Sequence, residues 1–240
     1  MKRTILFSVA FFLFMPIALN AQDNDNEESP WNLSADITSR YIWRGLQLSD
    51  GLNLQPTIEY SIGNFTIGSW GSYGVGIPFA EVDVYALYSL GNFSLLVSDY
   101  YEQDEYDLSA SKYFDWKQGQ TSHALEGAII YTGPEKFPIS ATAATFFYGC
   151  DDSDDDDKRD YSTYFELGYS FEVNDFGINP FIGGTPFKGT YCDKAGIVNV
   201  GFEVTKDISI SNNFKLPISG AFIVNPSAQH VFLVFKLTLQ

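Results

Sequence analysis

From Trp31 to the C-terminus the chain alternates apolar and polar residues at every second position, in segments of about ten residues. In the first segment, 31–44, Leu33 and Ile37 fall on one face, and Asp36, Arg40 and Arg44 fall on the other. Successive side chains of a β-strand point to opposite faces of a sheet. Each segment therefore predicts a strand with one apolar and one polar face.

Twelve such segments are separated by turn signals, and they start near residues 31, 53, 65, 80, 93, 121, 137, 161, 177, 196, 213 and 230. Some connections are short and carry Gly-Asn, a tight hairpin signal, whereas others are longer and polar, above all 103–120 and 149–160. Short turns at one end and long loops at the other predict an all-β, antiparallel up-and-down barrel of the outer membrane. Pro56, Pro180 and Pro217 fall inside predicted strands, where we expect a local bulge at each.

The kind of residue on each face favours a transmembrane barrel over a soluble one. Hydrophobic residues make up 45% of the chain, aromatic residues 17% and charged residues only 18%. A soluble β-sandwich or lipocalin-like barrel is the alternative, but its outward strand faces are polar. Here the bulky aromatic residues gather on the apolar face. In hydrocarbon every backbone group must be paired, which only a closed sheet achieves.

The N-terminus predicts export. Lys2 and Arg3 precede the short apolar stretch Ile5–Leu19, and Ala21 offers a small residue for cleavage, so residues 1–21 predict a signal peptide. The alternative, a membrane anchor, is disfavoured because fifteen residues are short for a span. Residues 22–30 predict a flexible acidic leader, and residues 31–240 the barrel. The predicted location is the bacterial outer membrane.

Net charge excludes one class of partner. Loss of the signal peptide removes two cations and no acids, which takes the net charge from −16 to about −18. Nucleic-acid binding needs a basic patch. The predicted partners are instead outer-membrane lipid, lipopolysaccharide and small solutes, and the sequence does not specify an oligomeric state.

One stretch carries a family resemblance. In "SRYIWRGLQLSDG", the element S-x-Y-x-W-R-G is followed by a short Ser-Asp loop, and a Trp-Gly pair follows on the third strand. This region resembles the start of the TorF-like porins, a bacterial outer-membrane family. The resemblance covers roughly the first 45 mature residues and implies an outer-membrane barrel without supplying a solute. The matching residues are Ser39, Tyr41, Trp43, Arg44, Gly45, Ser49, Asp50, Trp70 and Gly71.

The polar strand faces predict the lining of a pore. In this interpretation Tyr41 and Trp43 face lipid at the outer interface, where amphipathic rings are favoured. In an open pore, charges of both signs would select solutes by their charge. In a plugged lumen, the same charges would form ion pairs that stabilise the interior, and a barrel of twelve strands fits either alternative. A net acidic lining favours cations or neutral solutes. The predicted lining residues are Asp36, Arg40, Arg44, Glu59, Glu81, Asp83, Glu126, Glu166, Glu203, Lys215 and Lys236.

The segment "CDDSDDDDKRD" is a candidate cation site. Its aspartates can coordinate a hard cation such as Ca²⁺, although the spacing is not that of an EF-hand. The alternatives are a solvated acidic loop, and divalent ions that bridge the loop to lipopolysaccharide. No other cofactor is predicted. The candidate ligands are Asp151, Asp152, Asp154, Asp155, Asp156 and Asp157.

Cys150 and Cys192 are the two cysteines of the chain. An even cysteine count in an exported protein predicts a disulfide, provided that the two loops bring the residues close together.

Catalysis is not predicted. The two histidines, His123 and His230, lie at predicted strand starts, and G-x-S-x-G is absent. The predicted function is passive diffusion of small solutes through a narrow, charge-lined barrel. The alternative is a non-conducting barrel whose acidic outer loops bind a ligand, a partner or divalent-bridged lipopolysaccharide.

Overall fold

The computed structural model describes residues 29–151, 159–211 and 214–240. The predicted signal peptide and most of the predicted leader lie outside these residues. Within them, no helix has the length and apolar character needed to cross a membrane.

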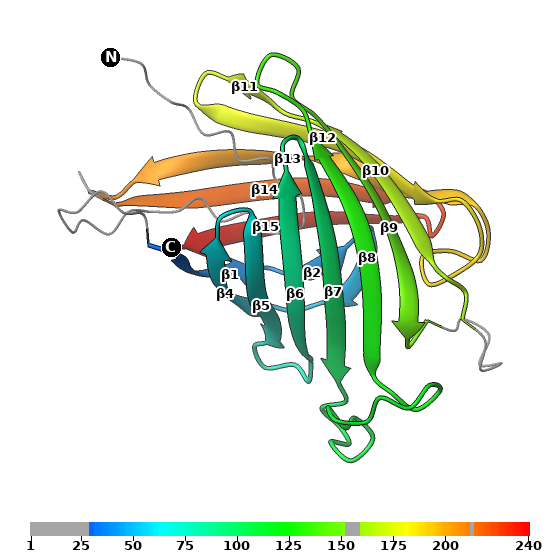
Figure 1. Cartoon of the computed structure of the whole chain (residues 1–240). Coiled ribbons are helices and arrows are strands. Elements are labelled where there is room, and N and C mark those ends of the chain that lie inside the picture. The colour runs from blue at the N-terminus through cyan, green and yellow to red at the C-terminus, as the bar shows by residue number, and fades with distance from the viewer. Residues whose placement is uncertain (1–28, 152–158, 212–213) are drawn as a thin grey trace.

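The described chain folds into strands alone (Figure 1). Their bounds are β1 Trp31–Thr38, β2 Tyr41–Trp43, β3 Leu46–Ser49, β4 Asn53–Ile62, β5 Phe65–Gly74, β6 Ala80–Leu90, β7 Phe93–Gln103, β8 His123–Thr132, β9 Ile139–Gly149, β10 Thr163–Tyr169, β11 Phe171–Val173, β12 Phe176–Thr185, β13 Gly196–Ser209, β14 Lys215–Asn225 and β15 His230–Leu239.

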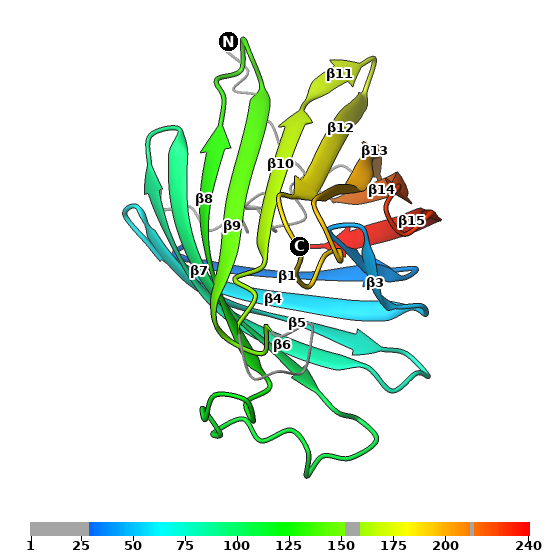
Figure 2. The ribbon, with the colours of Figure 1, turned by 90° about the vertical axis from the view of Figure 1, so that its right-hand side faces the viewer.

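These strands form a closed antiparallel barrel. Each wall strand pairs with its neighbour along the wall, β1 pairs with β15, and both β10 and β11 pair with β12. Because β10 and β11 are two parts of one interrupted wall strand, the wall has twelve strands, and the predicted up-and-down barrel is confirmed. Figures 1 and 2 show this wall in two views at right angles.

The alternating sequence pattern separates the two faces of the wall. Cross-strand partners share a face, so exposed pairs such as Leu95 with Ile129 and Phe222 with Leu233 mark the outside. The inside is more polar and largely buried. The consecutive apolar residues Leu95-Leu96-Val97 follow the same rule, since Leu96 points inward and packs with Ala128 and Ala144.

The wall accommodates its prolines without the expected bulges. The ladder from β4 to β5 omits Pro56, and Pro180 pairs with Phe202 on β13 while its other side meets the break between β10 and β11. Pro217 pairs with Asp207 and lies beyond the last pair between β14 and β15. Each proline, which lacks an N–H, therefore lies where a ladder is already interrupted on one side.

The first predicted strand, 31–44, is too long. The wall strand β1 ends at Thr38, and residues 41–49 form a separate hairpin of β2 and β3. The hairpin belongs to a second sheet, and its buried side chains pack against inward-facing residues of the wall. Figure 2 shows β3 beside the connection between β12 and β13 at one mouth of the barrel.

Candidate functional site: the lumenal hairpin

The hairpin reverses direction over two residues, Arg44 and Gly45. Trp43 pairs with Leu46, and both turn residues have positive φ, 49° for Arg44 and 80° for Gly45. This is the pattern of a type I′ turn, the two-residue turn that matches strand twist. A Cβ on Gly45 would lie 1.9 Å from the carbonyl oxygen of Val198, so glycine is also required by the neighbouring wall.

The residues around the turn reach different parts of the wall. Ile42 packs into an apolar cluster of β14 and β15 that includes Ile223 and Phe232. Tyr41 lies against Trp70 of β5, with ring centroids 5.3 Å apart. Trp43 packs against Tyr100 of β7, with ring centroids 5.6 Å apart. The hairpin thus wedges across the lumen.

This arrangement corrects the predicted positions of two aromatic residues. Tyr41 and Trp43 were expected to face lipid, but Tyr41 is buried and both rings pack on inward-facing aromatic side chains. The reason is that the chain leaves the wall after Thr38, so the alternation of β1 no longer determines where these side chains point.

Arg44 is held by a buried carboxylate on β8. Its Nη1 lies 2.5 Å from Glu126 Oε1 and its Nη2 lies 2.8 Å from Glu126 Oε2. The pair is therefore bidentate, the geometry in which a guanidinium and a carboxylate interact most strongly. Both side chains are almost fully buried, at 6% and 1% exposure. Such a pair is costly to break, since the remaining charge would be left without its partner.

Aromatic side chains enclose this ion pair. The Arg44 guanidinium lies 4.5 Å from the Trp43 ring centroid and 4.8 Å from that of Tyr164. Tyr100 donates a hydrogen bond to Glu126 over 3.0 Å. Tyr191, in the connection between β12 and β13, accepts a hydrogen bond from Arg44 and donates one to Glu126.

Burial raises the pKa of Tyr191, so its hydroxyl stays neutral and available as a donor. Tyr191 lies next to Trp43 as well, with ring centroids 5.5 Å apart. The β12–β13 connection therefore contributes a second segment to the lumen, packed against the hairpin.

Most other inward carboxylates also have partners in the lumen. Lys236 of β15 lies 3.7 Å from Asp36 and 3.8 Å from Glu203, which ties the closing seam of the barrel together. Glu59 accepts hydrogen bonds from Asn32 at 2.9 Å and from Tyr85 at 2.6 Å.

Glu166 completes this set of partnered carboxylates. It accepts a hydrogen bond from Asn199 at 2.9 Å and another from the hydroxyl of Tyr164, the residue that also stacks on Arg44. These ion pairs and hydrogen bonds therefore connect strands through the lumen, and the same side chains give the inner face its charge.

Glu81 and Asp83 differ from this pattern. Both point inward from β6 and are buried, with 5% and 6% exposure. Glu81 Oε2 and Asp83 Oδ1 have no hydrogen-bond partner among the described residues. Glu102 of β7 is the direct cross-strand neighbour of Glu81, so three carboxylates lie on one part of the inner wall.

Two other predicted lining residues lie away from the buried interior. Arg40 is half-buried at the base of the hairpin, with Nη1 3.4 Å from Gln47 Oε1. Lys215 is exposed at the short-turn end of the barrel and lies 3.6 Å from Asp207. Neither forms part of the aromatic and ionic cluster around Arg44.

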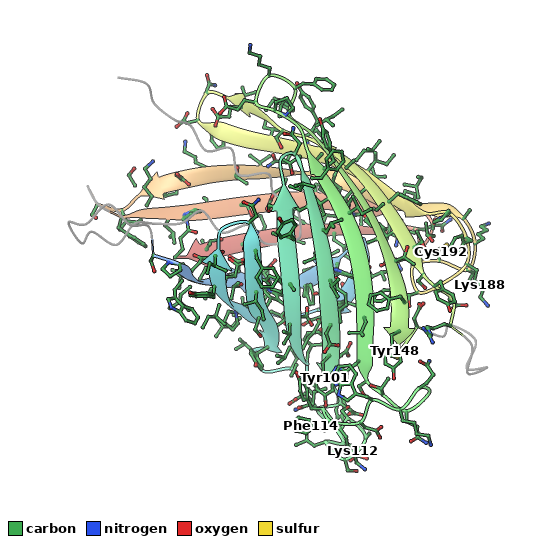
Figure 3. The ribbon with its side chains drawn as sticks, in the orientation of Figure 1. Tyr101, Lys112, Phe114, Tyr148, Lys188 and Cys192 are labelled. Atoms are coloured by element: carbon green, nitrogen blue, oxygen red, sulfur yellow. The ribbon has the colours of Figure 1, made fainter. Side chains whose placement is uncertain are left out.

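The structure does not join Cys150 and Cys192 in a disulfide, which corrects that prediction. Cys192 packs against the lumenal cluster of Phe146, Tyr164 and Tyr191, whereas Cys150 is exposed beyond the end of β9. Figure 3 shows Cys192 in the connection that also carries Lys188. The two loops keep the thiols in different environments.

The candidate metal loop is only partly described. Asp152 and Asp154–Asp157 lie outside the described residues. Asp151 is buried, and its carboxylate accepts a hydrogen bond from the backbone N–H of Ser162 at 2.9 Å. Among the described residues, no three histidine, cysteine or acidic side chains are grouped as metal ligands.

The environment of His123 was not predicted from the sequence. His123 is fully buried, and Trp116 stacks on its ring at a centroid distance of 3.8 Å. His123 Nδ1 lies 2.9 Å from Asp99, and Nε2 lies 2.6 Å from the carbonyl oxygen of Tyr113. His123 shares the outward face with Tyr101, so residues 104–122, here called the β7–β8 flap, cover the outside of the wall. Figure 3 shows the labelled flap residues Lys112 and Phe114 below Tyr101.

Comparison with protein-family models and with curated proteins gives no match to this chain. The assignment of the lumenal cluster therefore depends on its own geometry. Arg44 and Glu126 were predicted from the sequence to line the lumen, but the tyrosines around the pair, Tyr100, Tyr164 and Tyr191, were not. The signal that could have located the turn is Arg44-Gly45 between two apolar residues.

Proposed function

We propose that this protein is an outer-membrane β-barrel of the TorF-like porin type. It admits small solutes to a lumen that the β2–β3 hairpin constricts. The observation that carries the membrane location is the exposed apolar belt of the barrel wall. Leu33 of β1, Leu95 of β7, Ile129 of β8, Leu167 of β10 and Leu233 of β15 are each at least half exposed. A soluble barrel would present such a belt to water, at the cost of solubility.

The polarity of the two faces supports the same proposal. Outward positions carry leucine, isoleucine, valine and phenylalanine, whereas inward positions carry acids, amides, hydroxyls and basic residues. This is the reverse of a soluble barrel and the pattern expected of an outer-membrane barrel. The resemblance of residues 39–51 to the TorF-like porins agrees with this reading.

Because the β2–β3 hairpin narrows the lumen, we expect only small solutes to pass. The hairpin contacts the inner wall on β5, β7, β8 and β14, so a solute would pass beside it. The acidic side chains on β6 and β7 favour cationic over anionic solutes on this route.

Planar-bilayer recording tests the proposal. Purified wild-type protein is expected to give small, cation-preferring conductance steps. A variant in which a short turn replaces residues 40–51 is expected to give larger steps. Both samples should first show heat-modifiable migration on detergent gels, which reports a folded membrane barrel.

One specific observation favours a second candidate function, a non-conducting barrel. The Arg44–Glu126 pair is bidentate, buried and enclosed by aromatic rings, as a permanent brace would be. The non-conducting barrel would be favoured if neither wild-type protein nor the shortened variant conducts while both keep heat-modifiable migration.

A further inference from the structure

Two buried acids of the inner wall, Glu81 and Asp83, each have one carboxylate oxygen without a hydrogen-bond partner among the described residues. The inference drawn from them rests on the proposed function. We propose that Glu81 and Asp83 form a lumenal subsite for the primary ammonium group of a cationic solute, with Glu102 as the accessible carboxylate at its entrance.

The order of the three acids along the wall gives the subsite an entrance. Glu102 lies at the long-loop end of β7 and is exposed. Glu81, its cross-strand neighbour, is buried at the start of β6, and Asp83 lies two residues further along the same inward face. A cation entering from this mouth meets an accessible carboxylate first and buried carboxylates next.

Two buried carboxylate oxygens on β6 are available to accept hydrogen bonds from a ligand. Glu81 Oε2 and Asp83 Oδ1 are buried without a hydrogen-bond partner. The side chain of Tyr41 in the hairpin lies next to Glu81, and the backbone of Tyr101 lies next to Asp83. Buried polar atoms are normally paired, and carboxylates directly opposite each other repel. A bound cation would pair the buried carboxylate oxygens and would also reduce the repulsion between neighbouring carboxylates.

The lumenal cations Arg44 and Lys236 of the described residues already have acidic partners. Arg44 is paired with Glu126, and Lys236 is paired with Asp36 and Glu203. These cations therefore balance the charge of other acids, and the counter-charge of Glu81 and Asp83 would come from a bound solute.

The surroundings favour an ammonium group over a metal ion. Calcium takes six to eight oxygen ligands and magnesium six, which is more than the four carboxylate oxygens that Glu81 and Asp83 offer together. An ammonium has three N–H donors, which suits a few carboxylate oxygens. Tyr41 is in contact with Trp70 and Phe79, with ring centroids 5.3 Å and 6.0 Å away, so an aromatic wall adjoins the acids. Such a wall would contact the carbon atoms of an organic amine and stabilise its charge.

Thermal unfolding of the full-length barrel in detergent tests the subsite, with methylammonium chloride as the probe and sodium chloride at equal ionic strength as the reference. Wild-type protein is expected to show a saturable rise in unfolding midpoint with methylammonium. The double variant Glu81→Gln, Asp83→Asn should bind with an apparent affinity at least tenfold weaker. Glu203→Gln, which changes a buried lumenal acid paired with Lys236, is the matched control and should respond as wild type does.

The proposal is overturned if the double variant responds as wild type does, or if sodium chloride produces the same rise. The single variant Glu81→Gln, which keeps the volume of the side chain, serves if the double variant lacks a heat-modifiable band, and it should weaken binding severalfold. Bilayer recording separates the two proposals. Methylammonium binding without conductance would remove the pore and keep the subsite, whereas conductance without binding would remove only the subsite.

Discussion

Arg44 and Glu126 lie 82 residues apart in sequence and meet as a bidentate ion pair in the interior of the barrel. The pair joins the tip of an inward hairpin to strand β8, and the aromatic rings of Trp43 and Tyr164 cover the guanidinium. Burial by itself lowers the pKa of Arg44, but the neighbouring charge of Glu126 outweighs this and the net pKa is raised. Arg44 is therefore a permanent cation within the hairpin.

Removing one member of this pair should be strongly destabilising. Arg44→Met or Glu126→Met is expected to lower the free energy of unfolding by about 3–5 kcal/mol, because each leaves a buried charge unpaired. The double variant should lose less than the sum of the two single losses. Urea unfolding of the refolded barrel in lipid vesicles measures all four proteins. Additive losses would contradict a direct ionic coupling.

The hairpin turn should tolerate no side chain at Gly45. Gly45→Ala combines a positive φ of 80° with a Cβ placed 1.9 Å from the Val198 carbonyl oxygen. Gly76→Ala is a matched control, since Gly76 has a φ of 78° and no atom within 4 Å of the added Cβ. The control should cost about 1–2 kcal/mol from backbone conformation alone. Gly45→Ala should cost clearly more in the same unfolding measurement, and equal losses would show that the hairpin is not seated against β13.

The location of the apolar belt predicts a large effect of a single charge. Leu233 is 56% exposed on the outer face. In a bilayer, Leu233→Lys should destabilise the barrel by about 2–4 kcal/mol if the residue lies near the midplane. In water an exposed substitution would change stability by only about 0.5 kcal/mol. Glu172→Lys, at an exposed position of β11 next to a short turn, is the control and should have little effect. A negligible effect of Leu233→Lys in vesicles would contradict lipid exposure at this site.

The β7–β8 flap should open when its anchor is removed. His123→Ala removes the contacts to Asp99, to the Tyr113 carbonyl oxygen and to the stacked Trp116 ring. Loss of these contacts should favour the open flap by about 2 kcal/mol, or roughly thirtyfold in population. Trypsin cleavage after Lys112 or Lys117 measures this population. His230→Ala changes an exposed histidine and is the control; equal cleavage rates in the two variants would refute the anchor.

The wall could be predicted from the sequence because its signal is local. The alternation of residues such as Val231, Leu233 and Phe235 depends only on the strand period, and the twelve predicted strand starts lie within about two residues of the observed ones. Gly63 and Gly91 occupy the first positions of two-residue turns with φ of 58° and 60°, as their Gly-Asn sequences predict.

The interior could not be predicted in the same way. Tyr41 and Trp43 continue the alternation of β1, so periodicity alone extends the first strand past the point where the chain turns inward. The side chains that surround the Arg44–Glu126 pair come from β7, β8, β10 and the β12–β13 connection, and contacts over such sequence distances leave no periodic pattern. His123 was underestimated for a similar reason, since its cover comes from a flap whose path the sequence does not specify.

The tethers of the hairpin determine what kind of opening the lumen can undergo. Two residues, 39–40, connect the hairpin to β1, and three residues, 50–52, connect it to β4, which is the neighbour of β1 in the wall. At about 3.5 Å per residue, these tethers span only roughly 7 and 10 Å. The hairpin therefore cannot leave the lumen as a plug unless a wall strand separates from its neighbour. Any change in the width of the passage must come from small tilts of a hairpin that stays connected to β1 and β4.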